Sequence, residues 1–275
     1  MSEHHLGNSK RTVARVISIV ITCVLVPLCI ACGVWLFADR QYMLVSVIIA
    51  LLALVPFFVA FERGGHTAGE LVTVAVMTAI SVVGRIIFVF LPGFKPVTAV
   101  VIITGMAFGA EAGFVTGAFS ALLSNVFYGQ GPWTPIQMFV WGLCGFISGL
   151  LFFRRLSVGG RESSNPQNVV SDNILVANNG CAPSSDLHQN TLAPWWLIVI
   201  VGIVGGVFYS LAMDVWTVLS TTSDFSWSAY GAVVATSLPV TCEYAVSNVV
   251  FLLLLYKPLT VKCNRLKTKY GLFQR

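Results

Sequence analysis

The sequence predicts an all-α polytopic membrane protein with about eight transmembrane helices. Of its 275 residues, 56% are hydrophobic and only 10% are charged, and the mean hydropathy is +0.84. A soluble domain carries about 25% charged residues, so this chain has too little polar surface to cover a soluble core. Its apolar residues also gather in runs of about 20, the length that crosses a bilayer. These observations exclude an ordinary cytosolic enzyme and a disordered protein.

The first three predicted spans each end at polar or turn-forming residues. Residues 13–37 end before Ala-Asp-Arg, and residues 42–61 end before Glu-Arg-Gly-Gly-His. Residues 69–91 end before Pro-Gly-Phe-Lys-Pro.

The fourth apolar stretch, residues 97–127, is either one long helix or two short helices hinged at residues 109–113, Gly-Ala-Glu-Ala-Gly. Cytoplasmic loops of membrane proteins are enriched in Lys and Arg, and this bias distinguishes the two arrangements. With two short helices and a cytoplasmic N-terminus, 13 of the 16 Lys and Arg residues are cytoplasmic, two are outside, and Arg85 is within a span. One long helix divides them less clearly, 11 against 4. We therefore predict eight spans with both termini in the cytoplasm.

Three further spans are predicted at residues 133–153, 193–219 and 231–256. The stretch at 157–191 is rich in Ser, Asn, Gly and Asp and has no apolar period, so we expect a flexible cytoplasmic linker there. The chain is expected to end in a basic cytoplasmic tail at residues 266–275.

Small residues recur at helical spacing in several spans. Residues four apart share a helix face, and small side chains let two backbones approach closely. Compact packing within the bundle is the expected role of the glycines. The stripe formed by Ala75 and Ala79 in the third span could instead receive a helix of another protein. The glycines with this spacing are Gly105, Gly109, Gly113 and Gly117, then Gly145 and Gly149, then Gly202 and Gly206.

Polar side chains inside the predicted spans form the first candidate site. Such groups are costly in a membrane, and they usually mark a binding site, a pathway or a pairing. Arg85 could form a structural ion pair with Asp214 or Glu243, and such a pair could also line a site. The predicted topology places most of this polar set in the outer half of the membrane: Arg85, Asn125, Gln137, Trp141, Asp214, Glu243 and Asn248.

The second candidate site is the predicted outer loop at residues 128–135, Tyr-Gly-Gln-Gly-Pro-Trp-Thr-Pro. Its glycines permit positive φ and its prolines fix φ, so the loop is preshaped. Gln130, Trp133 and Thr134 offer amide, stacking and hydroxyl contacts to an aromatic or amide-bearing small molecule. A tight turn with an interfacial Trp is the alternative interpretation. The other outer loops carry Phe94, Lys95 and Trp227.

The sequence predicts no catalytic, metal or cofactor site. It contains no GxxxxGK[ST] phosphate loop, no HExxH metal motif and no GxSxG nucleophile motif. Its seven cysteines are scattered, which supports neither a disulfide framework nor a zinc site. The basic residues flank apolar segments, so nucleic acid is not an expected partner. A membrane-embedded binder rather than an enzyme is expected.

Several of these motifs, taken in order, resemble the substrate-binding S components of energy-coupling factor (ECF) vitamin transporters. The resemblance extends over residues 69–265. It implies a six-helix core at residues 67–265, and the first two spans, in an N-terminal unit at residues 1–66, and the long linker are additional to the core of that family. The similar stretches are AxxxA at 75–79, GRIIF at 84–88, PGFKPV at 92–97, GAEAGF at 109–114, GQGPWTP at 129–135, SLP at 237–239 and SNVVF at 247–251.

The resemblance implies a multi-pass protein of a prokaryotic plasma membrane that captures a vitamin or vitamin precursor at its outer face. It implies no catalysis by this chain itself, and it places the substrate site in the outer half of the membrane. The implied partners are a transmembrane T component and two cytoplasmic ATPase subunits. Ala75 and Ala79 would dock on the T component.

The residues do not identify the ligand. A corrinoid such as cobalamin is the first expectation from the resemblance. Thiamine or a pyrimidine precursor is the second, since Glu243 could meet a cation and Trp133 or Trp227 could stack on its ring. The alternative function is a self-sufficient secondary transporter that uses Glu243 or Asp214 as its proton carrier. A membrane enzyme acting on lipid would need a metal or a nucleophile, and the sequence displays neither.

Overall fold

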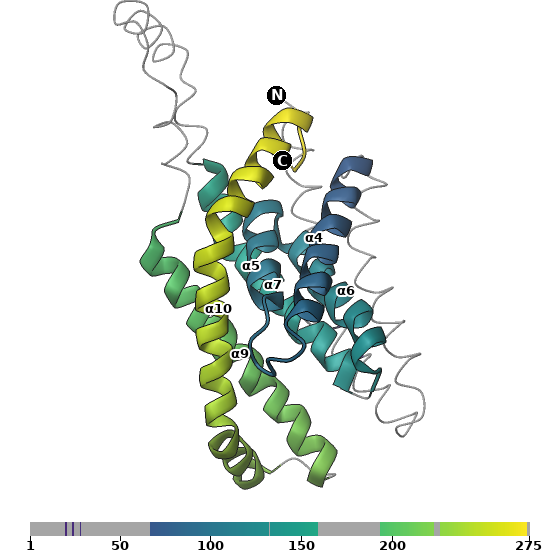
Figure 1. Ribbon diagram of the computed structural model, residues 1–275, viewed down its shortest axis with the longest axis vertical. Helices are drawn as coiled ribbons and strands as arrows, with labels where there is room; N and C mark the ends of the chain where they lie inside the picture. Colours follow the sequence, from purple (N-terminus) through teal and green to yellow (C-terminus); the bar gives the residue numbers. More distant parts are fainter. Residues whose placement is uncertain are drawn as a thin grey trace, which may run out of the picture.

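The computed structural model describes residues 67–131, 133–158, 193–222 and 226–273, together with the single positions 20, 24 and 28. Throughout this part of the chain the protein is helical, in agreement with the predicted class (Figure 1). The six helices are α4 (Ala68–Ile87), α5 (Val97–Phe108), α6 (Ala110–Tyr128), α7 (Trp133–Val158), α9 (Trp195–Thr222) and α10 (Trp227–Tyr270).

Two of the eight predicted spans, 13–37 and 42–61, lie outside the described residues except for the single positions above. Nearly all of the predicted linker at 157–191 also lies outside them. These two spans and the domain boundaries at 1–66 and 67–265 therefore stay predictions.

Four of the helices are long and apolar enough to cross a membrane, namely α4, α7, α9 and α10. In the same part of the chain the sequence predicted six spans. α5 has only 12 residues and is about 18 Å long, against a hydrocarbon core of about 30 Å. These four helices are consistent with a polytopic membrane protein, but they are fewer than the six spans predicted for this part of the chain, and α5 is too short to cross the bilayer.

The stretch at residues 97–127 forms two helices, as predicted, and the break between them is at Gly109. The φ angle of Gly109 is 102°, a region open to glycine and strained for other residues. Its N–H still caps α5 by donating to the Gly105 carbonyl at 2.9 Å. Every residue of α5 is buried, so α5 forms the centre of a bundle made by α4, α6, α7 and α10.

Glycines let the backbones of α5, α6 and α7 approach one another closely. A Cβ atom placed on Gly113 would lie 2.5 Å from the carbonyl oxygen of Gly145, and a Cβ on Gly145 would overlap the carbonyl of Gly113. Gly105 faces the same Gly145 carbonyl. This geometry confirms the packing role predicted for the glycine stripe, although Gly109 divides that stripe between two helices.

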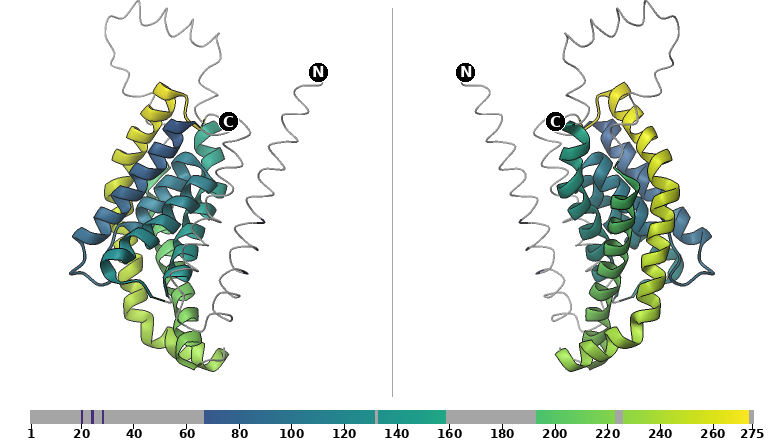
Figure 2. Two further views of the ribbon diagram at one scale, coloured as in Figure 1. Left: turned by 90° about the vertical axis from the view of Figure 1, so that its right-hand side faces the viewer. Right: turned by 90° about the vertical axis from the view of Figure 1, so that its left-hand side faces the viewer.

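α9 and α10 form a long hairpin. α10 has 44 residues, about 66 Å, and it contains Pro239 and Pro258 within its length. It therefore begins before and ends after the predicted span at 231–256. The predicted tail at 266–275 is helical as far as Tyr270, because no glycine or proline lies between Pro258 and Gly271. Figures 1 and 2 both show the tip of this hairpin extending beyond the ends of the other helices.

The residues after α10 fold back onto the beginning of α4. Gly271 has a left-handed backbone, with a φ of 63°, and the side chains of Leu272 and Phe273 are buried. The Phe273 N–H donates to Glu70 Oε1 at 2.6 Å, and Glu70 is itself buried. The start of α4 and the end of α10 therefore lie at one end of the bundle, here called the Glu70 end. The opposite end, where α4 finishes, is the Arg85 end.

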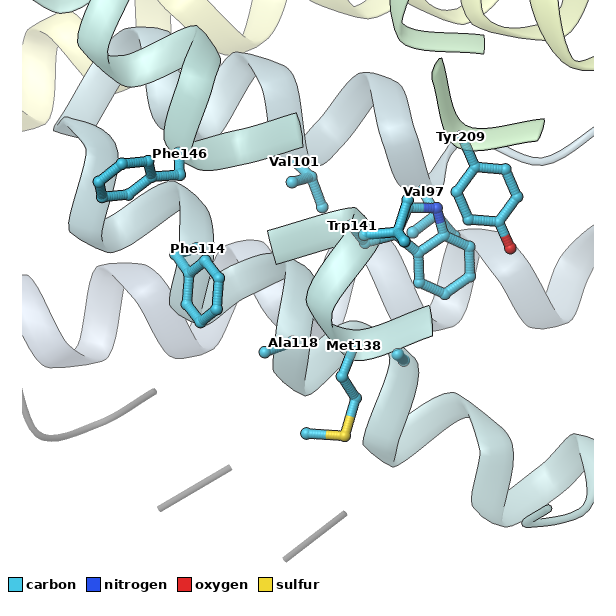
Figure 3. Packing of buried hydrophobic residues seen from close by; sticks show 10 residues of the cluster. Val97, Val101, Phe114, Ala118, Met138, Trp141, Phe146 and Tyr209 are labelled. Carbon is cyan, nitrogen blue, oxygen red and sulfur yellow. The ribbon is translucent and has the colours of Figure 1, made fainter. Parts of the chain in front are cut away.

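A buried cluster joins α5, α6, α7 and α9 through the middle of the bundle (Figure 3). At the Arg85 end of this cluster, Trp141 of α7 and Tyr209 of α9 stack beside Val97, the first residue of α5. The cluster is apolar elsewhere, so these two residues bring polar atoms into its end. The labelled members are Val97, Val101, Phe114, Ala118, Met138, Trp141, Phe146 and Tyr209.

Candidate functional site

Arg85 lies in the last turn of α4 with only 6% of its surface exposed. Its Nη1 donates to Asn125 Oδ1 at 2.8 Å and also to Ser124 Oγ, both on α6. The hydroxyl of Tyr128, one turn further along α6, donates to the Arg85 backbone carbonyl at 2.6 Å. A buried charge is tolerated only when hydrogen-bonded or paired, and α6 supplies part of that compensation.

The expected ion pair of Arg85 with an acid is not formed among the described residues. Asp214 accepts a hydrogen bond from Ser237 Oγ at 2.7 Å, within the α9–α10 hairpin. Glu243 accepts from the Gly93 N–H at 3.0 Å. The prediction of a structural pair is therefore wrong for this part of the chain, because both acids are held by other groups.

A chain of amide hydrogen bonds leads from Arg85 across the bundle. A guanidinium can only donate, so the carbonyl of Asn125 faces Arg85 and its NH₂ group faces away. That NH₂ donates to Thr134 Oγ1 and to Gln137 Oε1, each at 2.9 Å. Gln137 Nε2 then donates to the Tyr209 hydroxyl oxygen at 2.9 Å. The chain thus connects α4, α6, α7 and α9, and the donors all point in one direction.

Aromatic rings surround the guanidinium. Arg85 Cζ lies 4.5 Å from the ring centroid of Tyr128 and 4.8 Å from that of Trp141. The Trp141 ring stacks on Tyr209, with the centroids 5.2 Å apart and 9° between the planes, and Tyr244 meets Tyr209 edge-on at 5.1 Å. Cation–π contacts of this kind contribute about 2 kcal/mol or more when desolvated.

Lys95 brings a second cation to the same place. Its Nζ lies 5.1 Å from the Tyr128 ring centroid. Burial lowers the pKa of this lysine, and the charge of Arg85 lowers the pKa further, whereas Glu243 raises it. The Tyr128 ring is therefore flanked by two basic side chains. These residues, with Ser124, Asn125, Thr134, Gln137, Trp141, Tyr209 and Tyr244, are called the Arg85 cluster below.

The loop between α4 and α5, residues 88–96, is tied to α10. Besides the Glu243 contact, Ser247 Oγ accepts from the Lys95 N–H at 3.0 Å. The rings of Phe88, Phe94 and Phe251 pack together with centroid distances of 5.0–6.1 Å. These contacts fix the position of Lys95 relative to Arg85.

Residues 70–163 match the family model described as ECF transporter, substrate-specific component. The match confirms the S-component resemblance over this region, which extends from the first turn of α4 past the end of α7. No curated protein and no solved structure matched the chain. A match to this family implies a membrane protein that has a small-molecule substrate and T and ATPase partner subunits.

The S-component region contains most of the predicted binding residues that the structure brings together. Arg85, Lys95, Asn125, Thr134 and Gln137 all belong to the Arg85 cluster. The cluster also includes residues that were not predicted: Ser124, Tyr128, Tyr209 and Tyr244. A tyrosine within an apolar span is the sequence signal that could have identified Tyr209, because a buried hydroxyl requires a partner.

The remaining predicted residues lie around the Arg85 cluster or away from it. Gln130 Nε2 donates to the Leu122 carbonyl at 2.9 Å, and Trp133 lies over Gly131 with 41% of its surface exposed. Asn248 is buried in α10. Trp227 is 78% exposed at the hairpin tip, so it does not reach the Arg85 cluster. Phe94, Asp214 and Glu243 have the structural contacts given above.

The predicted docking residues Ala75 and Ala79 lie on an exposed face of α4. The larger side chains on the same face are also apolar and exposed: Val72, Val76, Val83 and Ile87. The opposite face of α4 carries buried residues such as Val74 and Met77. In the described part of the chain, no group of three or more His, Cys, Asp or Glu side chains is placed to hold a metal.

Proposed function

We propose that this chain is the substrate-specificity subunit of an ECF-type importer, and that it binds a vitamin or vitamin precursor at the Arg85 cluster without catalysing a reaction. The observation that carries the proposal is a buried, hydrogen-bonded group of polar and aromatic side chains at one end of an apolar bundle, and all but Tyr209 and Tyr244 of this group belong to the region that matches the S-component family. Convergent polar groups in an otherwise apolar setting are typical of small-molecule sites.

The proposed partners are a transmembrane T component and two cytoplasmic ATPases. Small residues on an exposed helix face permit close helix–helix approach, and Ala75 and Ala79 provide such a face on α4. We expect Ala75→Leu and Ala79→Leu to abolish co-purification with the T component while ligand binding is retained. Ala232→Leu is the matched control, because Ala232 is also exposed but lies on α10. Normal assembly of both α4 variants would contradict the docking role.

The proposed location is a prokaryotic plasma membrane, with both termini in the cytoplasm. Basic residues concentrate in the last part of α10, at the Glu70 end of the bundle. The positive-inside rule then places that end in the cytoplasm and the Arg85 end outside. A C-terminal reporter active only in the cytoplasm should be active, and an inactive reporter would reverse the orientation.

Mass spectrometry of small molecules extracted from gently purified protein tests the binding function. A vitamin or precursor present at one molecule per protein supports the proposal, and a corrinoid or a thiamine-type compound would match the two expectations from the resemblance. Uptake into proteoliposomes that contain this chain alone, driven by a proton gradient, would instead support the secondary transporter. In that mechanism the buried Asp214 is the proton carrier to test first, by Asp214→Asn.

A further inference from the structure

We infer that the molecule bound at the Arg85 cluster carries an anionic oxygen group, a carboxylate or a phosphate, which contacts the open edge of the Arg85 guanidinium. The inference rests on the proposed binding function, and it names the chemistry of the ligand. Its starting point is a set of buried donors at this site that lack acceptors among the described residues.

The first open donors belong to Arg85 itself. Both hydrogen bonds that its side chain makes within the described residues use Nη1. Nε is buried and has no hydrogen-bond partner in the described part of the chain. Nε and Nη2 together form the side-on edge of a guanidinium, the edge that matches the two oxygens of a carboxylate or phosphate. Nη1 of Arg85 is thus hydrogen-bonded to α6. The edge formed by Nε and Nη2, which suits an oxyanion, has no hydrogen-bond partner among the described residues.

Two aromatic donors accompany this edge. Trp141 Nε1 is also buried without a partner in the described residues, and the Trp141 ring lies 4.8 Å from Arg85 Cζ. The Tyr209 oxygen accepts from Gln137, so its own proton is available to donate, and no acceptor for it is found among the described residues. Trp141 and Tyr209 stack directly on each other. A ligand that satisfies this site must therefore offer acceptors.

The positive charges at the site favour an anionic acceptor over a neutral one. Arg85 and Lys95 flank the Tyr128 ring, and neither forms an ion pair with an acid among the described residues. Glu243 acts on Lys95 electrostatically without forming an ion pair with it, and its carboxylate accepts the Gly93 N–H. A buried charge without a counter-ion is costly, and a charge-assisted hydrogen bond is about twice as strong as a neutral one. An oxyanion compensates the charge and accepts the open donors, whereas a thiamine-type cation would add a third positive charge.

Matched pairs of compounds test the inference on the full-length protein in lipid nanodiscs. The carboxylate pairs are nicotinate with nicotinamide, pantothenate with panthenol, and biotin with biotinamide. The phosphate pair is riboflavin 5′-phosphate with riboflavin. Within a pair that binds, we expect the anionic member to bind about 10- to 100-fold more tightly, the range for a hydrogen bond to a charged group. The type of pair that responds distinguishes a carboxylate from a phosphate.

Two variants connect this preference to the named donors. Trp141→Phe keeps a ring and removes the Nε1–H, and Arg85→Lys keeps the charge and removes the side-on edge. Each should reduce the ratio of anionic to neutral affinity, by about 10-fold for Trp141→Phe. Trp196→Phe is the control, because Trp196 lies at the start of α9 with 52% of its surface exposed. The ratio is measured within one variant, so a general loss of folded protein lowers both affinities and leaves the ratio unchanged.

The possible results distinguish the claim that the ligand is anionic from the claim that the chain binds a ligand. Equal or tighter binding of the neutral member, or a neutral or cationic molecule extracted with the protein, overturns the anionic group and leaves the binding function standing. An anionic molecule extracted with the protein supports both. A folded protein that binds no member of any pair and carries no extracted molecule overturns both.

Discussion

Replacing Asn125 with alanine removes the residue that connects Arg85 to α7. The Asn125 side chain makes three buried hydrogen bonds, to Arg85 Nη1 at 2.8 Å and to Thr134 and Gln137 at 2.9 Å each. Interhelical hydrogen bonds in membranes average about 0.6 kcal/mol, which gives about 2 kcal/mol for the three. The values for soluble proteins, about 2 kcal/mol for the charged bond and 1 kcal/mol for each neutral one, give about 4 kcal/mol.

We therefore expect Asn125→Ala to lower the free energy of unfolding by about 2 to 4 kcal/mol. Unfolding in mixed detergent–lipid micelles, followed by circular dichroism as the denaturing detergent is increased, measures the change. Asn264→Ala is the control. Asn264 is half-buried in α10, and its backbone carbonyl accepts the Thr268 hydroxyl. The control should shift stability by less than about 0.5 kcal/mol.

A loss below about 1 kcal/mol would refute this reasoning, because one missing bond to a charged group already accounts for that amount. It would mean that Arg85 and Gln137 find other partners when Asn125 is absent. The hydrogen-bonded chain from α4 to α9 would then not be a unit, and ligand affinity should also be unchanged.

Three further predictions concern the packing, the chain end and the outer loop. Gly145→Ala should prevent the close approach of α7 to Gly113 and reduce the yield of folded protein. The ligand affinity of the folded fraction should stay within about threefold of the original value. A normal yield and melting temperature would contradict the backbone contact. Phe273→Ala should cost about 3 to 5 kcal/mol locally, since a buried aromatic side chain is lost, and faster proteolysis of the C-terminus measures the loss. Gln130→Ala and Trp133→Ala should each weaken ligand binding by more than about 1 kcal/mol in calorimetry, and unchanged affinity in both would place the site away from that loop.

The sequence alone was sufficient to predict the all-α membrane class and the break near Gly109. Membrane class depends on composition and on the length of apolar runs, which are properties of the chain itself. The break could be predicted because the distribution of Lys and Arg across the membrane differs between one long helix and two short ones. The S-component resemblance over α4–α7 was likewise present in local motifs that occur in order.

The partners of the charged groups could not be predicted from the sequence. Arg85 was singled out as an intramembrane charge, but its expected partner was an acid, and the structure provides amides, hydroxyls and aromatic rings instead. Glu243 and Asp214 satisfy nearer groups in the loop at 88–96 and in the α9–α10 hairpin. Sequence periodicity gives the face of a helix but not which neighbouring helix that face meets.

The length of α10 and the burial of Phe273 were also decided by tertiary packing and not by local sequence. The composition of the last residues is basic and polar, so the sequence predicted a separate tail. The folded chain instead continues the helix and turns at Gly271, because Glu70 at the start of α4 accepts the Phe273 N–H and α4–α6 cover its ring. Local sequence therefore determined which segments form helices and enter the membrane. Only tertiary packing decided which buried donors lack partners around Arg85, because that depends on hydrogen bonds between residues 39 to 72 positions apart in the chain.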